Sequence, residues 1–161
     1  MAAPLPIAWL NGEFVAIENA RISPLDRGFL FADSVYEVMP VYAGRPFLFN
    51  AHIGRLERSL AALGMTAPMA RAQWIDLLQQ MVERNGGGEQ FIYLQVTRGV
   101  EFGRNHAPAA GLAPTIFLMA SPLSALDPTI RVHGVDAVTV ADERWKRCDI
   151  KRSEERRVGK E

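Results

Sequence analysis

The first part of the chain alternates short apolar runs with turn-forming residues. Apolar runs at 7–10 and 13–16 flank Asn11 and Gly12, a dipeptide that tolerates the two positive φ angles of a type I′ turn. This pattern predicts a β-hairpin. The segment 21–28, which follows, is rich in turn formers and is interpreted as a loop.

A longer strand is predicted over Val35–Tyr42, where apolar and aromatic residues are dense. Pro40 interrupts this run. Proline has no N–H for the ladder, which favours an edge position or a bulge. Residues 43–44 then turn the chain back, and 46–49 is predicted to complete a second hairpin.

Two amphipathic helices are predicted next. The first covers 51–63, with Asn50 as its N-cap and Gly64 ending it, because apolar residues recur at steps of three and four. The second runs from about 70 to 84. The apolar positions of the two helices are Ile53, Leu56, Leu60 and Leu63, followed by Trp74, Leu77, Leu78 and Met81.

The remaining apolar runs predict strands at 91–97, 115–120 and 131–140, the last continuing to 151. Between the first two lies a Gly-, Pro- and Asn-rich loop at 98–113. A loop of this length is typically functional or mobile.

The order of strands, then two helices, then strands is typical of the α+β class, with the two helices on one face of an antiparallel or mixed sheet. We expect a small α+β domain and the first strands of an incomplete larger one. The expected divisions are 1–120 for the small domain, 121–128 for a linker, 129–151 for the start of the large domain, and 152–161 for a non-native tail. The tail resembles a translated sequencing adapter, and a solvated charged helix end is the alternative.

Composition limits the classes of partner that the protein is expected to bind. The 161 residues carry 18 Lys and Arg against 18 Asp and Glu, so the formal net charge is zero. This balance disfavours nucleic acid and anionic membranes as partners, and no apolar run approaches the roughly 20 residues that span a bilayer. The N-terminus lacks the features of a signal peptide, and the single cysteine, Cys148, cannot form an intrachain disulfide. The sequence predicts a cytoplasmic protein.

The residues alone indicate little chemistry. Metal-ligand spacings and phosphate-binding glycine loops are missing from the sequence, so no metal is predicted. Arg55 on the first predicted helix could hold a phosphate, and the pair Arg104 and His106 could hold a carboxylate; solvated side chains are the alternative. A lysine near the end could form a Schiff base, but periodicity does not choose between Lys146 and Lys151.

Six collinear segments carry a family resemblance: WLNG at 9–12, DRG at 26–28, DSVYEV at 33–38, HIGRL at 52–56, YLQVTRG at 93–99 and RWKRCDIK at 144–151. Together they make the chain resemble the D-amino-acid transaminases, which are fold type IV enzymes dependent on pyridoxal 5'-phosphate. Within that superfamily, the Arg-Cys-Asp-Ile-Lys run and the Arg-x-His pair point to the D-amino-acid branch.

The resemblance implies a role for each matching residue. Lys151 corresponds to the lysine that forms the aldimine with pyridoxal phosphate and carries the proton, and Arg55 to the arginine that pairs with the cofactor phosphate. Arg144 is expected to support the cofactor region. Tyr36, Arg104 and His106 are similar to the residues that bind the substrate α-carboxylate, with the loop residues coming from the partner of a homodimer.

The implied reaction is reversible amino transfer between a D-amino acid such as D-alanine and a 2-oxo acid such as 2-oxoglutarate. Ser34 and Pro40 depart from the family pattern without removing a catalytic group. The family continues well beyond its lysine, so we expect this chain to be an inactive fragment. Alternatives are another fold type IV enzyme, an aminodeoxychorismate lyase or a branched-chain aminotransferase, or a non-catalytic dimerising α+β module.

Overall fold

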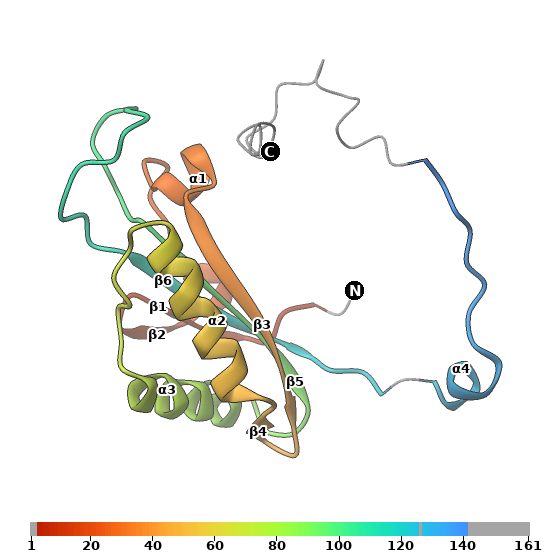
Figure 1. Ribbon diagram of the computed structural model, residues 1–161. Helices are drawn as coiled ribbons and strands as arrows, with labels where there is room; N and C mark the ends of the chain where they lie inside the picture. Colours follow the sequence, from red (N-terminus) through yellow and green to blue (C-terminus); the bar gives the residue numbers. More distant parts are fainter. Residues whose placement is uncertain (1–2, 126, 142–161) are drawn as a thin grey trace. The chain divides into compact units, whose positions relative to one another are not determined.

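The computed structural model describes residues 3–125 and 127–141. The chain divides into two compact units, Met1–Leu123 and Ser124–Glu161, and each is described by itself. The first unit contains a six-stranded sheet whose paired strands all run antiparallel, in the order β2-β1-β6-β5-β3-β4 (Figure 1). The strands are β1 (Ile7–Leu10), β2 (Glu13–Ala16), β3 (Ser34–Tyr42), β4 (Arg45–Pro46), β5 (Gln90–Thr97) and β6 (Thr115–Pro122).

The first hairpin is confirmed. Asn11 and Gly12 join β1 to β2 with φ angles of 48° and 108°, so both turn residues occupy the positive region that a type I′ turn requires. The Asn11 side chain also accepts a hydrogen bond from the Ile116 N–H at 2.8 Å. The turn thus binds the hairpin to the beginning of β6.

The place of Pro40 explains how a proline fits inside β3. Its carbonyl accepts a hydrogen bond from Phe47 N–H at 2.8 Å, on the side of β3 away from β5. Because the N and the carbonyl of one strand residue point the same way, the missing N–H faces the side of the two-residue edge strand β4 and leaves the ladder to β5 intact. The predicted edge position is not found, because β3 itself lies between β5 and β4. The predicted strand at 46–49 is wrong beyond Pro46, because β4 has only two residues and the chain turns directly into a helix.

Helix α2 (Phe49–Ala62) and helix α3 (Arg71–Arg84) confirm the two predicted helices. The predicted N-cap at Asn50 is wrong. The Leu48 carbonyl accepts hydrogen bonds from the Ala51 and His52 N–H groups, so Leu48 occupies the cap position, with a φ of 49°. Gly64, with a φ of 66°, follows the end of α2 as predicted.

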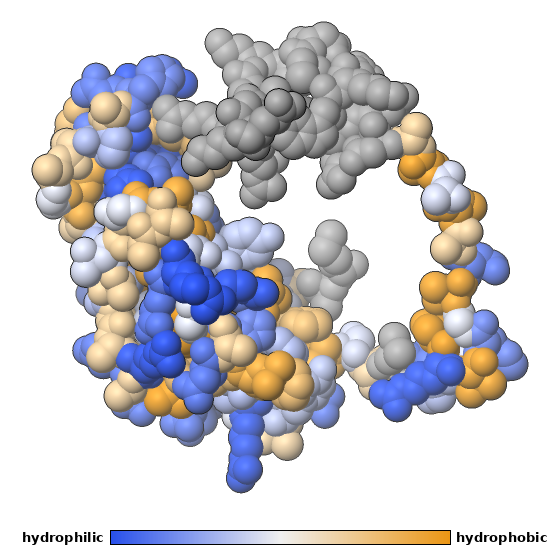
Figure 2. All heavy atoms as spheres, in the orientation of Figure 1, coloured by the Kyte–Doolittle hydropathy of each residue, from blue (hydrophilic) through white to orange (hydrophobic). Residues whose placement is uncertain are grey.

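Both helices bury an apolar stripe against the same face of the sheet, so the α+β expectation is confirmed (Figure 1). Figure 2 shows hydrophilic side chains gathered over α2, on the side away from the sheet. Burying one large apolar side chain contributes about 1.5–3 kcal/mol, so this cluster holds the layers together. Its most deeply buried members are Met39, Val41, Ile53, Leu56, Leu60, Trp74, Leu78, Met81, Ile92, Leu94, Val96, Leu118 and Ala120.

Two short helices were not predicted from the sequence, and the second begins within the segment interpreted as a loop at 21–28. The first is the 3₁₀ helix η1 (Ile17–Asn19), and the second is α1 (Arg27–Phe31). Asp26 caps α1 by accepting a hydrogen bond from the Gly28 N–H at 2.7 Å. A helix of five residues has too short an apolar repeat to be recognised from periodicity.

In the second unit the structure contradicts the predicted strand at 131–140. Helix α4 covers Pro128–His133, and the described residues after it, to 141, have no regular secondary structure. Asp127 accepts a hydrogen bond from the Thr129 N–H at 2.9 Å, and Pro128 occupies the first turn. These are local helix-start signals. Across residues 3–125 and 127–141, no helix combines the length and apolar character needed to cross a bilayer.

Candidate active site

The first group of candidate residues lies where β3 meets α2. Glu37, whose side chain is 2% exposed, accepts hydrogen bonds from Arg55 Nε at 2.6 Å and Nη2 at 2.5 Å. It also contacts His52 Nδ1 at 2.8 Å. His52 and Arg55 lie three residues apart on α2, so one helical turn brings both to the same carboxylate. Arg55 itself remains 61% exposed.

Hydrogen bonds between oppositely charged side chains set the pKa shifts of Glu37 and Arg55. Burial alone would raise the pKa of Glu37, but hydrogen bonds from Arg55 and His52 lower it below its ordinary value. The hydrogen bond to Glu37 raises the pKa of Arg55, and Tyr36 adds a smaller favourable interaction. The carboxylate therefore stays ionised and holds the Arg55 guanidinium in one orientation, while most of its surface faces solvent.

Tyr36 lies on the opposite face of β3 from Glu37 and is 60% exposed. Its ring stacks on Tyr93 of β5 with centroids 5.6 Å apart and an interplanar angle of 23°. Burial raises the pKa of the Tyr93 hydroxyl, which donates a hydrogen bond to Gln95 Oε1 at 2.9 Å. This stack fixes the Tyr36 ring at an open sheet surface.

The second group surrounds the loop that follows β5. Arg104 and His106 are exposed residues of this loop, and both approach the Phe31 ring of α1. The Arg104 guanidinium carbon lies 5.0 Å from the ring centroid, and the His106 ring lies 5.6 Å from it. The structure therefore places both Arg104 and His106 near the same aromatic ring.

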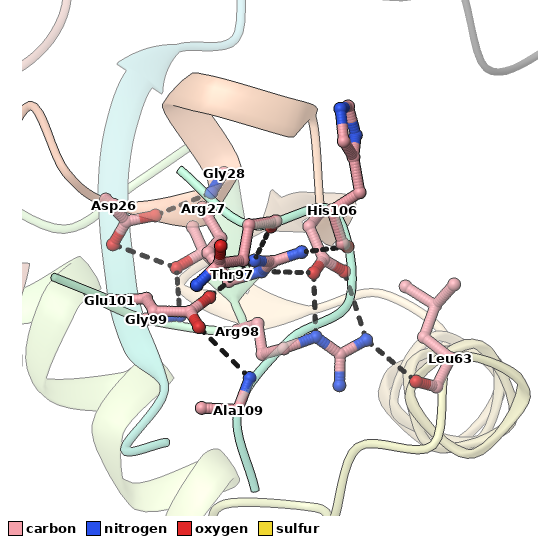
Figure 3. Close-up of polar contacts among 12 residues, drawn as sticks. Asp26, Arg27, Gly28, Leu63, Thr97, Arg98, Gly99, Glu101, His106 and Ala109 are labelled. Carbon is pink, nitrogen blue, oxygen red and sulfur yellow. Dashed lines mark hydrogen bonds and ion pairs between the residues drawn. The ribbon is translucent and has the colours of Figure 1, made fainter. Parts of the chain in front are cut away.

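Sequence reasoning missed the buried residue near this ring. Arg27, the first residue of α1, is 1% exposed and pairs with Asp33 and Glu101 (Figure 3). One signal in the sequence could have pointed to Arg27, because it belongs to the Asp-Arg-Gly segment of the family resemblance. A single arginine in a turn-rich segment gives no periodic indication of burial.

Lys151 and Arg144 lie outside the described residues. Their roles stay predictions. In the described part of the chain, no cluster of three or more His, Cys, Asp or Glu side chains is placed to hold a metal ion.

Residues 34–156 match the model of the family described as amino-transferase class IV. The chain belongs to this family. It is similar to the D-alanine aminotransferase of Listeria monocytogenes, with 37% identity over 148 residues that cover 88% of this chain and 50% of the relative. It is 38% identical to the D-alanine aminotransferase of Staphylococcus aureus, over 89% of this chain and 50% of that one. The chain thus spans about half the length of the curated relatives it matches.

Solved structures of other enzymes share the fold. The Escherichia coli branched-chain amino acid aminotransferase superposes with a TM-score of 0.69 and 21% identity, over 75% of this chain and 41% of that one. The 4-amino-4-deoxychorismate lyase of Pseudomonas aeruginosa gives a TM-score of 0.61 and 32% identity, over 74% and 41%. A second branched-chain amino acid aminotransferase, complexed with N-(5'-phosphopyridoxyl)-L-glutamate, gives 0.67 and 25%, over 74% and 41%.

The described residues fit the phosphate end of a pyridoxal cofactor. An anion of this kind needs a cation that is accessible and held still. The Arg55 guanidinium meets both needs, because Glu37 takes its Nε and Nη2 groups from one side and the side chain stays 61% exposed.

Proposed function

We propose that this chain forms part of a D-amino-acid transaminase that exchanges an amino group between a D-amino acid, of which D-alanine is the type, and 2-oxoglutarate. The observation that carries the proposal is the 37% identity to D-alanine aminotransferases over 88% of the chain. The approach of both Arg104 and His106 to the Phe31 ring supports it, because side chains of these two types are suited to binding a carboxylate.

In this proposal pyridoxal phosphate, when bound, supplies the electron sink for the charge that remains when the amino acid Cα loses its proton. Arg55 binds the phosphate through its exposed guanidinium, and Glu37 orients it. The Lys151 amine would hold the cofactor and would carry the proton to and from Cα. Arg144 supports the cofactor region.

Binding of the α-carboxylate decides which enantiomer reacts. Tyr36, Arg104 and His106 hold that carboxylate, which fixes the face of Cα that meets the Lys151 amine. Holding reacting groups in place in this way lowers a barrier by several kcal/mol. The proposal includes a homodimer, in which Arg104 and His106 of one subunit serve the site of the other.

The test uses the full-length enzyme that contains this chain. We expect it to convert D-alanine and 2-oxoglutarate to pyruvate and glutamate, followed by pyruvate reduction with lactate dehydrogenase. Replacing Lys151 by Ala should abolish turnover. Replacing both Arg104 and His106 by Ala should abolish D-alanine turnover while leaving the cofactor's visible absorbance. Unchanged kinetics in the double variant would refute the carboxylate assignment.

A second candidate is lyase activity on 4-amino-4-deoxychorismate. The 32% identity to the Pseudomonas aeruginosa lyase favours it. The same enzyme should be assayed for pyruvate and 4-aminobenzoate release from that substrate, and for transamination of L-leucine. Activity on either, without D-alanine turnover, would replace the proposal. If the enzyme is inactive on all three substrates and shows no cofactor absorbance, the result would favour the alternative of a non-catalytic dimerising module.

A further inference from the structure

The centre of this inference is a buried guanidinium under the loop that carries Arg104 and His106. Arg27 is 1% exposed, and its Nε donates to Asp33 Oδ2 at 3.0 Å while Nη1 donates to Glu101 Oε2 at 2.5 Å. Burial alone would lower the pKa of Arg27, but these two carboxylates raise it above its ordinary value. The charge is therefore kept in the interior and fully paired.

The same guanidinium also donates hydrogen bonds to the loop backbone at Asn105 and at His106. Nη1 donates to the Asn105 carbonyl at 2.8 Å, and Nη2 donates to the His106 carbonyl at 3.0 Å. These residues lie 78 and 79 positions from Arg27 in sequence. The contacts are to main-chain atoms, so they fix the path of the loop and leave the His106 imidazole pointing away from the buried cluster (Figure 3).

Glu101 attaches the loop at a further point. Its Oε2 pairs with Arg27, and its Oε1 accepts a hydrogen bond from the Ala109 N–H at 3.2 Å. Arg27 and Glu101 together therefore hold the loop on both sides of the segment between Asn105 and Ala109. A loop held at three backbone positions has few conformations left.

The Phe31 ring of α1 is the last part of this arrangement. The Arg27 guanidinium carbon lies 4.6 Å from the Phe31 ring centroid, and Arg104 lies 5.0 Å from the same centroid. The His106 ring also contacts Phe31. One helical turn of α1 thus supplies both the guanidinium that holds the loop backbone and the ring against which the two candidate side chains lie.

We propose that Arg27 is a positioning residue for the substrate-carboxylate site, which acts by holding the 101–109 segment so that Arg104 and His106 present their donors in a fixed geometry. This inference rests on the proposed function. Arg27 makes no contact with substrate in this proposal. Its planar guanidinium spans two carboxylates and two carbonyls at once, which a lysine ammonium with three donors cannot match.

The test compares Arg27→Lys with Arg98→Lys in the full-length enzyme. Arg98 is the matched control, because it also pairs with Asp33, at 2.7 and 3.1 Å, but its remaining side-chain hydrogen bond goes to the Leu63 carbonyl and not to Asn105 or His106. We expect Arg27→Lys to lower kcat/KM for D-alanine about 100-fold, through a raised KM, because a displacement near 1 Å costs that much. Arg98→Lys should stay within about threefold of wild type.

Two further readouts separate positioning from damage to the fold. The cofactor's visible absorbance should be unchanged in Arg27→Lys, and hydrogen exchange should become faster at the Ala109 amide. A wild-type KM in Arg27→Lys would overturn the proposal, as would an equal KM rise in Arg98→Lys. If Arg27→Lys does not fold, Glu101→Gln decides in the same way, because it removes the charge that holds both Arg27 and Ala109.

The result also separates this proposal from the proposed function. A wild-type enzyme that does not turn over D-alanine refutes the transaminase proposal alone. Hydrogen exchange at Ala109 then still tests the attachment of the loop. Slow exchange in Arg27→Lys, equal to wild type, would refute the attachment, whatever reaction the enzyme catalyses.

Discussion

Gly99 lies near the start of the loop that carries Arg104 and His106, and its backbone packs against Ala113 near the end of that loop. Replacing Gly99 by alanine should force these two backbone segments apart. Gly99 has a φ of 101°, which L side chains rarely adopt. A Cβ at this position would lie 1.8 Å from the Ala113 carbonyl oxygen, more than 1 Å short of the 3.0 Å that real contacts keep. The obstacle is backbone, so no side chain can rotate away.

The magnitude follows from a matched glycine in the same loop. Gly111 also has a positive φ, 74°, but a Cβ there would meet nothing within 4 Å. Gly111→Ala should therefore cost only the backbone strain, about 1–2 kcal/mol. Gly99→Ala adds a forced separation from Ala113, and the Gly99 carbonyl also accepts a hydrogen bond from the Arg27 N–H at 2.9 Å. We expect a loss of about 4 kcal/mol or more in the free energy of unfolding.

The assay is equilibrium unfolding in urea of the full chain carrying each substitution. The fluorescence of Trp9 and Trp74, both buried in the core, reports loss of packing. We expect a far lower midpoint for Gly99→Ala than for Gly111→Ala, with similar slopes. If the two variants unfold within about 1 kcal/mol of each other, the close approach of Gly99 to Ala113 does not exist in solution.

Two other perturbations test other parts of the molecule. Because the pKa of Glu37 is lowered from its ordinary value of 4.5, its pairing with Arg55 and His52 should stabilise the fold above pH 4.5 and be lost as pH falls through the lower folded-state pKa. Unfolding of Glu37→Gln should therefore depend less on pH in this acid range than that of wild type, and an unchanged pH profile would contradict the assigned partners. Asn85→Ala should cost about 2 kcal/mol in urea unfolding, since its side chain bonds both backbone groups of Ile7, each at 3.0 Å; a loss under about 0.5 kcal/mol would show these bonds to be dispensable.

Local sequence determined the elements whose signals repeat within a few residues. The hairpin at Asn11 and Gly12 followed from backbone freedom, and helices α2 and α3 from apolar residues spaced three and four apart. The predicted strand at 131–140 is wrong, because Asp127 and Pro128 start a short helix that covers its first residues.

The loop attachment was decided by the tertiary structure alone. The sequence singled out Arg104 and His106 but not Arg27, because Arg27 meets Glu101 only after β3 and β5 pair and bring positions 74 residues apart into contact. The same holds for Glu37, which finds Arg55 and His52 only when α2 packs on β3. A buried charge is stable only where folding places its partners around it, and no short-range pattern in the sequence records that placement.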